Sequence, residues 1–299
     1  MGIRDRARPA LVESDSKLWI FVVVMLPLET NNAHPRDHFI TFDDLKHVYT
    51  VTRDDVAERV VVSVTSFSKP YFKQFDGPEI VQKYYAAWKD NPHSRYHAIV
   101  WSTLSSGGTD AEAKQAILQS WVDVGETASA AGTSMHQLCE LVCNGVLEPA
   151  QETKETALLR VWLADFQTGM RWKPFRTEWK LWWDEPRLNG AVLVAGMLDL
   201  LLKSETTGQF ALIDFKRCKP SALLGPYANV RHHPGWAMSP LSETEDSKYG
   251  AYCMQLNILS KILRDRYDIN VHDRIYLLQV HEDMAKAHCV HVPAYANQT

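Results

Sequence analysis

Two aspartates and a lysine lie in neighbouring apolar stretches of the sequence, and together they could activate water against a phosphate. Asp199 interrupts the apolar run Val192–Leu202, and Asp214 interrupts a second run, Phe210–Phe215. A buried carboxylate is unfavourable unless it is paired, protonated or bound to a metal, and two close carboxylates repel unless a cation lies between them. Lys216 follows Asp214 by two residues and therefore shares its face of a strand. This set is suited to metal-assisted attack on a phosphate.

The segment between these runs predicts a β-hairpin. Lys203–Gln209 is polar and contains the turn signal Thr207-Gly208, so the two runs are expected to form adjacent antiparallel strands. The alternating stretch 175–183 predicts a further strand, and we expect its acid, Glu178, to be structural. An aspartate followed by a lysine is common in strands, so the functional interpretation depends on the rest of the chain.

A helix upstream of the hairpin carries two further candidates. His136 and Glu140 are four residues apart and share one face of a helix. The sequence predicts an amphipathic helix over 111–130, then a break or cap near Gly132 before the helix resumes. Gly132 would also permit close approach of the helix to a strand or a phosphate. By itself, a helical histidine is more often a core or surface residue than a ligand.

Four motifs then follow one another in a set order. They are Gly132-Thr133-x-x-His136-x-x-x-Glu140, Gly196-x-x-Asp199, Asp214-x-Lys216 and Gln255. This order resembles the PD-(D/E)XK nuclease superfamily, in particular the RecB-like branch that includes the mitochondrial genome maintenance exonuclease. Each motif is weak alone, but the four in order are fairly specific, and the resemblance covers roughly residues 130–282.

The resemblance implies an α/β fold with a central mixed β-sheet flanked by helices, a restriction-endonuclease-like core. It places the nuclease core in residues 110–299. The largely helical N-terminal part, residues 1–109, would form one wall of a nucleic-acid channel.

The resemblance also assigns a metal site, with Mg²⁺ or Mn²⁺ as the cofactor. Asp199, Asp214 and the backbone carbonyl of Phe215 would be oxygen ligands, which suit hard cations. His136 would add an imidazole ligand, which suits Mn²⁺ better than Mg²⁺. Glu140 is a weaker candidate that either holds a second metal through water or is a solvated helix residue.

Roles in catalysis follow from the same resemblance. Lys216 would orient or help deprotonate the attacking water, and Gln255 would position Lys216 or the DNA strand. Leu259 stands where the family usually has tyrosine, which either weakens DNA contacts or leaves that role to Tyr252, one turn earlier.

Several basic or polar side chains are candidates for phosphate contacts. Arg217 and Lys219 flank the lysine strand, and Lys248 begins a predicted helix over 248–267. Each is at least as easily explained as solvated surface charge. The pair His232-His233, in a long polar loop, could also reach the substrate.

The reaction implied is metal-dependent hydrolysis of DNA phosphodiester bonds that leaves a 5′-phosphate and a 3′-hydroxyl, in DNA repair or replication. We expect an exonuclease acting on DNA ends or single strands. The alternatives are a structure- or sequence-specific endonuclease with the same fold, and a nucleic-acid binding protein that has lost catalysis. A remote option is an enzyme acting on small phosphoesters.

Composition limits the remaining possibilities. The net charge of −4 gives no global basic signature, although a local basic groove is still possible. The five cysteines include no CxxC pair, which argues against a disulfide framework, a zinc site or an iron–sulfur cluster and favours a reducing intracellular compartment. Nucleus, mitochondrion and viral or host cytoplasm are not distinguished. The apolar run Leu18–Leu28 is too short to span a membrane and predicts a strand. No Walker A motif suggests ATP use, and the oligomeric state is open.

Overall fold

The computed structural model describes residues 9–10, 22–23, 26–53, 56–167, 171–185, 191–226 and 235–295. Chain contacts divide the protein into two compact units, which are described separately. The first unit comprises Met1–Tyr71 and His136–Thr299, and the second comprises Phe72–Met135. The predicted boundary at 109/110 therefore does not coincide with the compact units, because it falls inside the second one.

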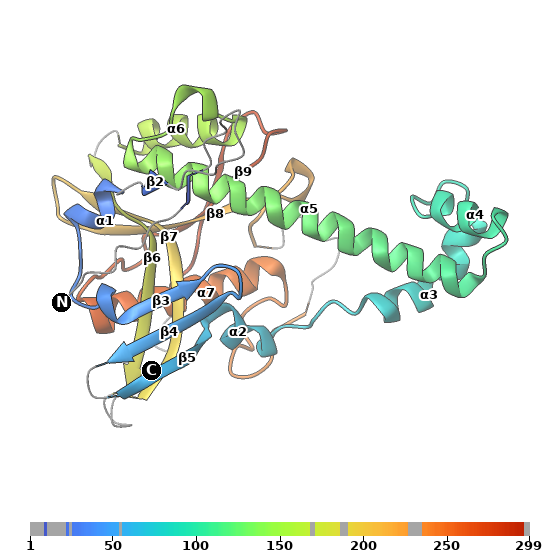
Figure 1. The fold of residues 1–299 in the computed structure, drawn as a ribbon, viewed down its shortest axis with the longest axis horizontal. Coiled ribbons are helices and arrows are strands. Elements are labelled where there is room, and N and C mark those ends of the chain that lie inside the picture. Colours follow the sequence, from blue (N-terminus) through green and yellow to red (C-terminus); the bar gives the residue numbers. More distant parts are fainter. Residues whose placement is uncertain are drawn as a thin grey trace. The chain divides into compact units, whose positions relative to one another are not determined.

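The first unit is an α/β structure built on a mixed eight-stranded sheet, as predicted (Figure 1). Its order is β10-β9-β8-β7-β5-β4-β3, and β6 pairs with the other edge of β7. The strands are β3 (Ile40–Asp43), β4 (Val48–Arg53), β5 (Val56–Ser63), β6 (Trp172–Glu185), β7 (Ala191–Ser204), β8 (Phe210–Arg217), β9 (Ile275–Val280) and β10 (His288–His291). The pairs β5–β7 and β8–β9 are parallel and the others antiparallel, which makes the sheet mixed.

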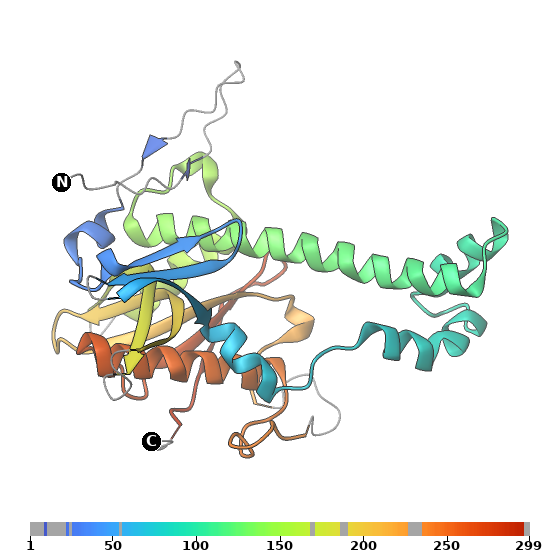
Figure 2. The same ribbon diagram turned by 60° about the horizontal axis from the view of Figure 1, so that its bottom comes forward.

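Helices cover both faces of this sheet. Figure 2 shows α6 on one face and α7 on the other. The helices of this unit are α1 (Pro27–Asn31), α2 (Val64–Ser68), α6 (Lys154–Gln167), α7 (Lys248–Tyr267) and the last turns of α5 (Asp110–Asn144). Short 3-10 turns are η1 (Asp37–Phe39), η2 (Lys69–Tyr71), η3 (Pro149–Gln151) and η5 (Pro220–Ala222). No helix among the described residues is long and apolar enough to cross a membrane.

The predicted hairpin is confirmed. Strands β7 and β8 pair antiparallel, from Leu200 opposite Ile213 to Lys203 opposite Phe210. Gly208 takes a φ of 70° in the connecting turn, a left-handed conformation that glycine adopts without strain. Most residues of β8 are buried, because helices cover both faces of the sheet here, so the strand reads as a nearly continuous apolar run rather than an alternating one.

One edge of β7 is shared by two strands, β8 and β5, which pair with different parts of it. Strand β6 runs along the whole of β7 on one side. On the other side, β8 pairs with residues 200–203, whereas β5 pairs with Val194 and Ala195. In the described part of the sheet, residues 196–199 of β7 pair with neither of these two strands. A polar site can therefore form where β5 and β8 diverge.

Gly196 lies where α2 and α7 approach β7. A Cβ atom at this position would lie 2.7 Å from Val64 Cγ2 and 2.9 Å from Leu259 Cδ2. We predict that Gly196→Ala lowers the free energy of unfolding by about 1–3 kcal/mol, because the packed neighbours must move. Urea denaturation would measure it. The control is Gly132→Ala, where a Cβ would meet nothing within 4 Å and the helix should gain about 0.5–1 kcal/mol. Equal effects of the two changes would contradict the prediction.

A buried arginine joins the segment before β3 to β6. Arg176 is 2% exposed, and its guanidinium donates to Asp37 at 2.7 Å and to the carbonyl of Asn32 at 2.8 Å. The indole N–H of Trp179 donates to the second oxygen of Asp37 at 2.7 Å. Asp37 therefore satisfies a buried charge and a buried indole together.

The second unit consists of α3 (Gly77–Asp90), α4 (His97–Ser105) and the first part of α5. Its core is formed by Val81, Tyr85, Tyr96, Val100, Ala113 and Ile117. The sequence of residues 91–108 by itself predicts a linker. This prediction was wrong, because α4 forms there and its Val100 is buried in this core.

Two further predictions were wrong. Helix α5 runs through Gly132 without a break, since one helical glycine costs only about 1 kcal/mol. In the apolar run Leu18–Leu28, the described residues form a strand only at Val22–Val23, and Pro27 begins α1 because proline suits the first helical turn. Leu26 and Leu28 are also described, Leu28 within α1, and the remaining residues of the run lie outside the described ones.

Candidate metal centre

The two predicted aspartates lie where β8 and β5 diverge. Asp199 and Asp214 are one residue beyond the Leu200–Ile213 pair, along β7 and β8 respectively. Both are buried. The Oδ2 atom of Asp199 accepts a hydrogen bond from the backbone N–H of Phe215 at 2.5 Å. The side chain of Asp199 thus joins the two strands at the point where their backbone pairing ends.

Helix α5 brings His136 to the same place. Its Nδ1 atom lies 3.5 Å from Asp199 Oδ1 and 3.6 Å from Glu178 Oε1. Burial alone would lower the pKa of His136, but the negative charges of Asp199 and Glu178 outweigh it and raise the pKa to about 11. Burial likewise disfavours the charge of Asp199, and His136 outweighs it, so that the pKa of Asp199 is lowered.

Glu178 completes a cluster that the sequence did not reveal. One ligand atom from each of His136, Glu178 and Asp199 lies within 4.8 Å of the others. The sequence predicted a structural role for Glu178. The β6–β7 register places this residue opposite Asp199, between the pairs Thr177–Leu200 and Trp179–Leu198. The local signal was a carboxylate in the interior of a strand rich in aromatic residues.

The backbone and the carboxylate of Glu178 both show unusual features. Its φ of 42° lies in the left-handed region, which costs a non-glycine residue of order 1–3 kcal/mol and is concentrated at functional sites. Its Oε1 atom is buried and has no hydrogen-bond partner among the described residues. Two carboxylates, one of which has this unpartnered oxygen, and an imidazole that has lost its proton form a donor set that fits a divalent cation such as Mn²⁺ or Mg²⁺.

Asp214 and Lys216 form a pair beside this cluster. Lys216 Nζ lies 2.5 Å from Asp214 Oδ2 and 4.7 Å from the centre of the Tyr252 ring. Burial raises the pKa of Asp214 to about 6 against the opposing charge of Lys216. Burial alone would lower the pKa of Lys216, but Asp214 outweighs it and raises that pKa. Lys216 is therefore a cation at neutral pH.

The predicted basic residues differ in their surroundings. Arg217 is paired with Glu155 of α6 at 2.9 Å and with Glu282 at 2.7 Å. Strand alternation turns Arg217 toward α6, whereas Lys216 contacts Tyr252 of α7. Two nitrogens of the Arg217 guanidinium, Nε and Nη2, are thus engaged within the protein, and its phosphate contact stays a prediction.

Lys219 and Lys248 are both exposed. Burial raises the pKa of the Cys218 thiol, and the positive charges of Lys248 and Lys216 oppose this shift, so Lys248 acts on the same end of β8 as Lys216. Their predicted phosphate contacts stay predictions. The pair His232-His233 lies outside the described residues.

The other predicted residues lie at the margins of the site. The buried carboxylate of Glu140 accepts from the Thr177 hydroxyl at 3.4 Å and is not part of the three-ligand cluster. Gln255 is half-buried on α7, and its positioning role stays a prediction. Leu259 is buried against the Gly196 backbone. Leu259, which stands where the family usually has tyrosine, therefore fills a packing position. Tyr252, one turn earlier, contacts Lys216.

We predict that Glu178→Gln weakens Mn²⁺ binding by at least roughly 10- to 100-fold, the loss typical even of groups that only support metal ligands. The amide keeps the shape of the side chain but removes the charge that a cation requires. Calorimetric titration of the full chain with MnCl₂ would measure the change. Glu185→Gln, seven residues along the same strand, is the control. An unchanged dissociation constant for Glu178→Gln would remove it from the site.

Comparisons with known proteins give no functional match for this chain. No protein-family model and no curated protein matches the chain. Among solved structures, the crystal structure of SSO0001 is similar over 54% of this chain, at 15% identity and a TM-score of 0.23. The similarity covers 66% of SSO0001, slightly less than two thirds of its length.

Proposed function

We propose that this protein is a metal-dependent deoxyribonuclease of the PD-(D/E)XK type, in the RecB-like branch. The observation that carries the proposal is the convergence of His136, Glu178 and Asp199 beside the Asp214–Lys216 pair. These five side chains come from a helix and three neighbouring strands and are brought together where the sheet divides.

The chemistry follows from the charges of the site. His136 must release its proton before it can hold a divalent cation together with Glu178 and Asp199. The bound cation would supply polarisation of the phosphate and a lower pKa for a bound water. Because Lys216 is positively charged, it acts by orienting the attacking water and stabilising negative charge on the phosphate rather than as a base. Asp214 and the ring of Tyr252 hold its ammonium group in place.

The substrate we propose is DNA, attacked from ends or as single strands by an exonuclease. An endonuclease would use the same residues. The five cysteines are free thiols, which supports a reducing intracellular compartment.

A cleavage assay tests the proposal. The full chain would be incubated with end-labelled single-stranded, linear duplex and closed circular DNA, in Mg²⁺, Mn²⁺ or EDTA. We expect metal-dependent cleavage of linear DNA, an intact circle, and no cleavage in EDTA. Cleavage of the circle would instead assign an endonuclease. Binding of DNA without cleavage in either metal would reject the nuclease and favour a binding protein.

A further inference from the structure

In the part of the first unit that the structure describes, the exposed aromatic side chains lie on α2 and in the loop 235–247. Among its described residues, Phe67 and Trp236 are the exposed aromatic side chains, at 45% and 54%. Met238, beside them in sequence, is 59% exposed. Other described phenylalanine, tyrosine and tryptophan side chains in this unit are buried or half-buried.

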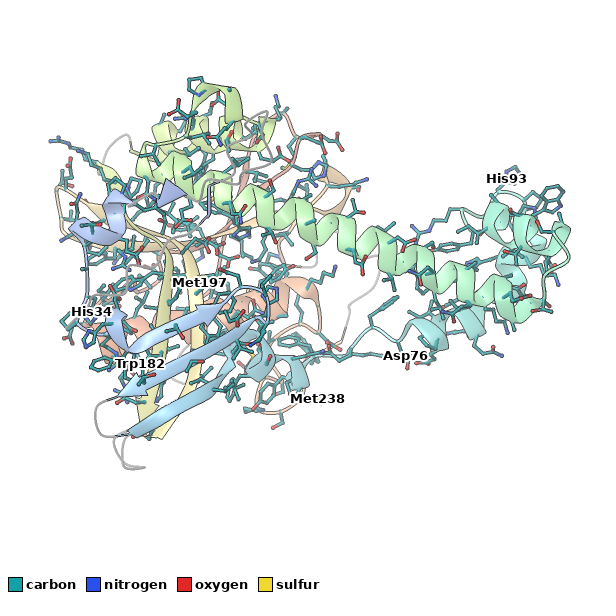
Figure 3. The ribbon with its side chains drawn as sticks, viewed as in Figure 1. His34, Asp76, His93, Trp182, Met197 and Met238 are labelled. Atoms are coloured by element: carbon teal, nitrogen blue, oxygen red, sulfur yellow. The ribbon has the colours of Figure 1, made fainter. Side chains whose placement is uncertain are left out.

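A ring contact and a backbone hydrogen bond connect the two segments that carry these residues. The aromatic patch is defined here as Phe67, Tyr71, Trp236 and Met238. The rings of Phe67 and Tyr71 are 6.3 Å apart between centres. The backbone N–H of Met238 donates to the carbonyl of Tyr71 at 2.8 Å, and Figure 3 shows Met238 beside α2. Trp236 pairs with Glu245 in an extended bridge. Ala237 between them is buried, whereas Trp236 and Met238 are exposed, so both of these side chains face solvent.

The patch is presented on a fixed backbone. In the loop 235–247, Ala237 N–H donates to Thr244 at 2.8 Å, and Asp246 N–H donates to Gly235 at 2.9 Å. The Thr244 hydroxyl also bonds Tyr295 at 3.1 Å. Apolar side chains held exposed on an ordered loop are suited to binding, because little freedom is lost when a partner docks.

The two segments of the patch, α2 with η2 and the loop 235–247, connect along the chain to β5, which pairs with β7, and to α7. Helix α2 starts after Ser63, which pairs with Ala195 of β7. Asp199 lies four residues farther along β7, or about 13 Å at the usual rise per residue. The loop 235–247 leads directly into α7, whose Tyr252 contacts Lys216. A polymer at the metal centre could therefore extend onto the patch.

We propose that the aromatic patch binds the nucleobases of single-stranded DNA next to the phosphate under attack. The inference rests on the proposed function and specifies its substrate class. Nucleobases stack on aromatic faces without regard to sequence, whereas the bases of a duplex are already stacked and paired. The exposed Lys69 in the same segment adds positive charge for the backbone.

The test measures binding in EDTA, so that cleavage does not interfere. The probes are a labelled 15-nucleotide thymidine strand and an abasic strand of equal length and charge, titrated with the full chain and followed by fluorescence anisotropy. We expect wild type to bind the thymidine strand at least tenfold more tightly than the abasic strand. Phe67→Ala with Trp236→Ala should remove this preference through a 10- to 100-fold loss on thymidine. Affinity for the abasic strand, and its salt dependence, should be unchanged, since no phosphate contact is lost.

Two further variants make the result specific. Trp236→Phe keeps an aromatic face and should keep most of the preference. Leu45→Ala removes an apolar side chain that is 97% exposed but outside the patch, and it should change nothing.

The proposal is overturned if wild type does not bind the thymidine strand or binds both strands equally, or if the double variant loses affinity for both alike. Sedimentation is the remaining check. A wild-type dimer that becomes a monomer in the double variant would assign the patch to a second copy of the chain. Cleavage without base preference would reject only the patch, whereas base preference without cleavage in any metal would reject the nuclease.

Discussion

Asp199→Asn is expected to lower kcat/KM for metal-dependent DNA cleavage by about 10³-fold or more, the scale seen when a preorganised electrostatic group is lost from an active site. Asparagine keeps an oxygen that can accept the Phe215 N–H, so the junction of β7 and β8 should persist. It removes the charge next to His136, and with it a carboxylate ligand for the cation. Metal affinity should therefore fall, and the His136 ring should be held less firmly.

Three measurements separate loss of chemistry from loss of fold. Single-turnover cleavage gives the rate, calorimetry with MnCl₂ gives the metal affinity, and thermal melting reports the fold. Asp273→Asn is the matched control, because that carboxylate is 75% exposed and lies outside the site. A variant Asp199→Asn that cleaves within tenfold of wild type would contradict the mechanism.

Asp37→Ala is expected to lower the free energy of unfolding by about 3–5 kcal/mol, the range for removing one partner of a buried ion pair. Arg176 would be left with its charge buried and one carbonyl acceptor, that of Asn32. The indole of Trp179 would lose its acceptor as well. A change of this size corresponds to a fall in melting temperature of roughly 10 °C.

Thermal and urea denaturation would measure the effect of Asp37→Ala. Asp44→Ala is the control, since Asp44 is exposed in the turn that follows β3. A further variant, Arg176→Met with Asp37→Ala, should recover part of the loss, because no unpaired charge is then buried. An unchanged melting temperature in Asp37→Ala would show that Arg176 finds other partners.

Some features of the candidate site are determined by residues close together in the sequence, and others only by the folded sheet. The spacing of Asp214 and Lys216 on one strand is local, and so is the position of Tyr252 within an uninterrupted helix. The unusual conformation of Glu178 is not local. Its left-handed φ is retained inside a fourteen-residue strand that packs against β7, so the surrounding sheet must stabilise a conformation that the residue alone disfavours.

Local periodicity by itself determined a large part of this protein. The hairpin of β7 and β8, the extent of α7 and the shared face of Asp214 and Lys216 follow from residues only a few positions apart, where side-chain direction repeats every two or 3.6 residues. The same patterns failed at Gly132, because neighbouring helical turns outweigh one glycine, and over 91–108, because α4 is stabilised by packing rather than by its own periodicity.

Only the tertiary structure decided which distant side chains meet. The register of β6 on β7 placed Glu178 opposite Asp199. Arg217 forms ion pairs with Glu155 and Glu282, which lie far from it in the sequence. The aromatic patch depends on the hydrogen bond between the loop 235–247 and η2. These contacts depend on strand order and register, which are set by burial summed over the whole sheet, and no short stretch of sequence specifies them.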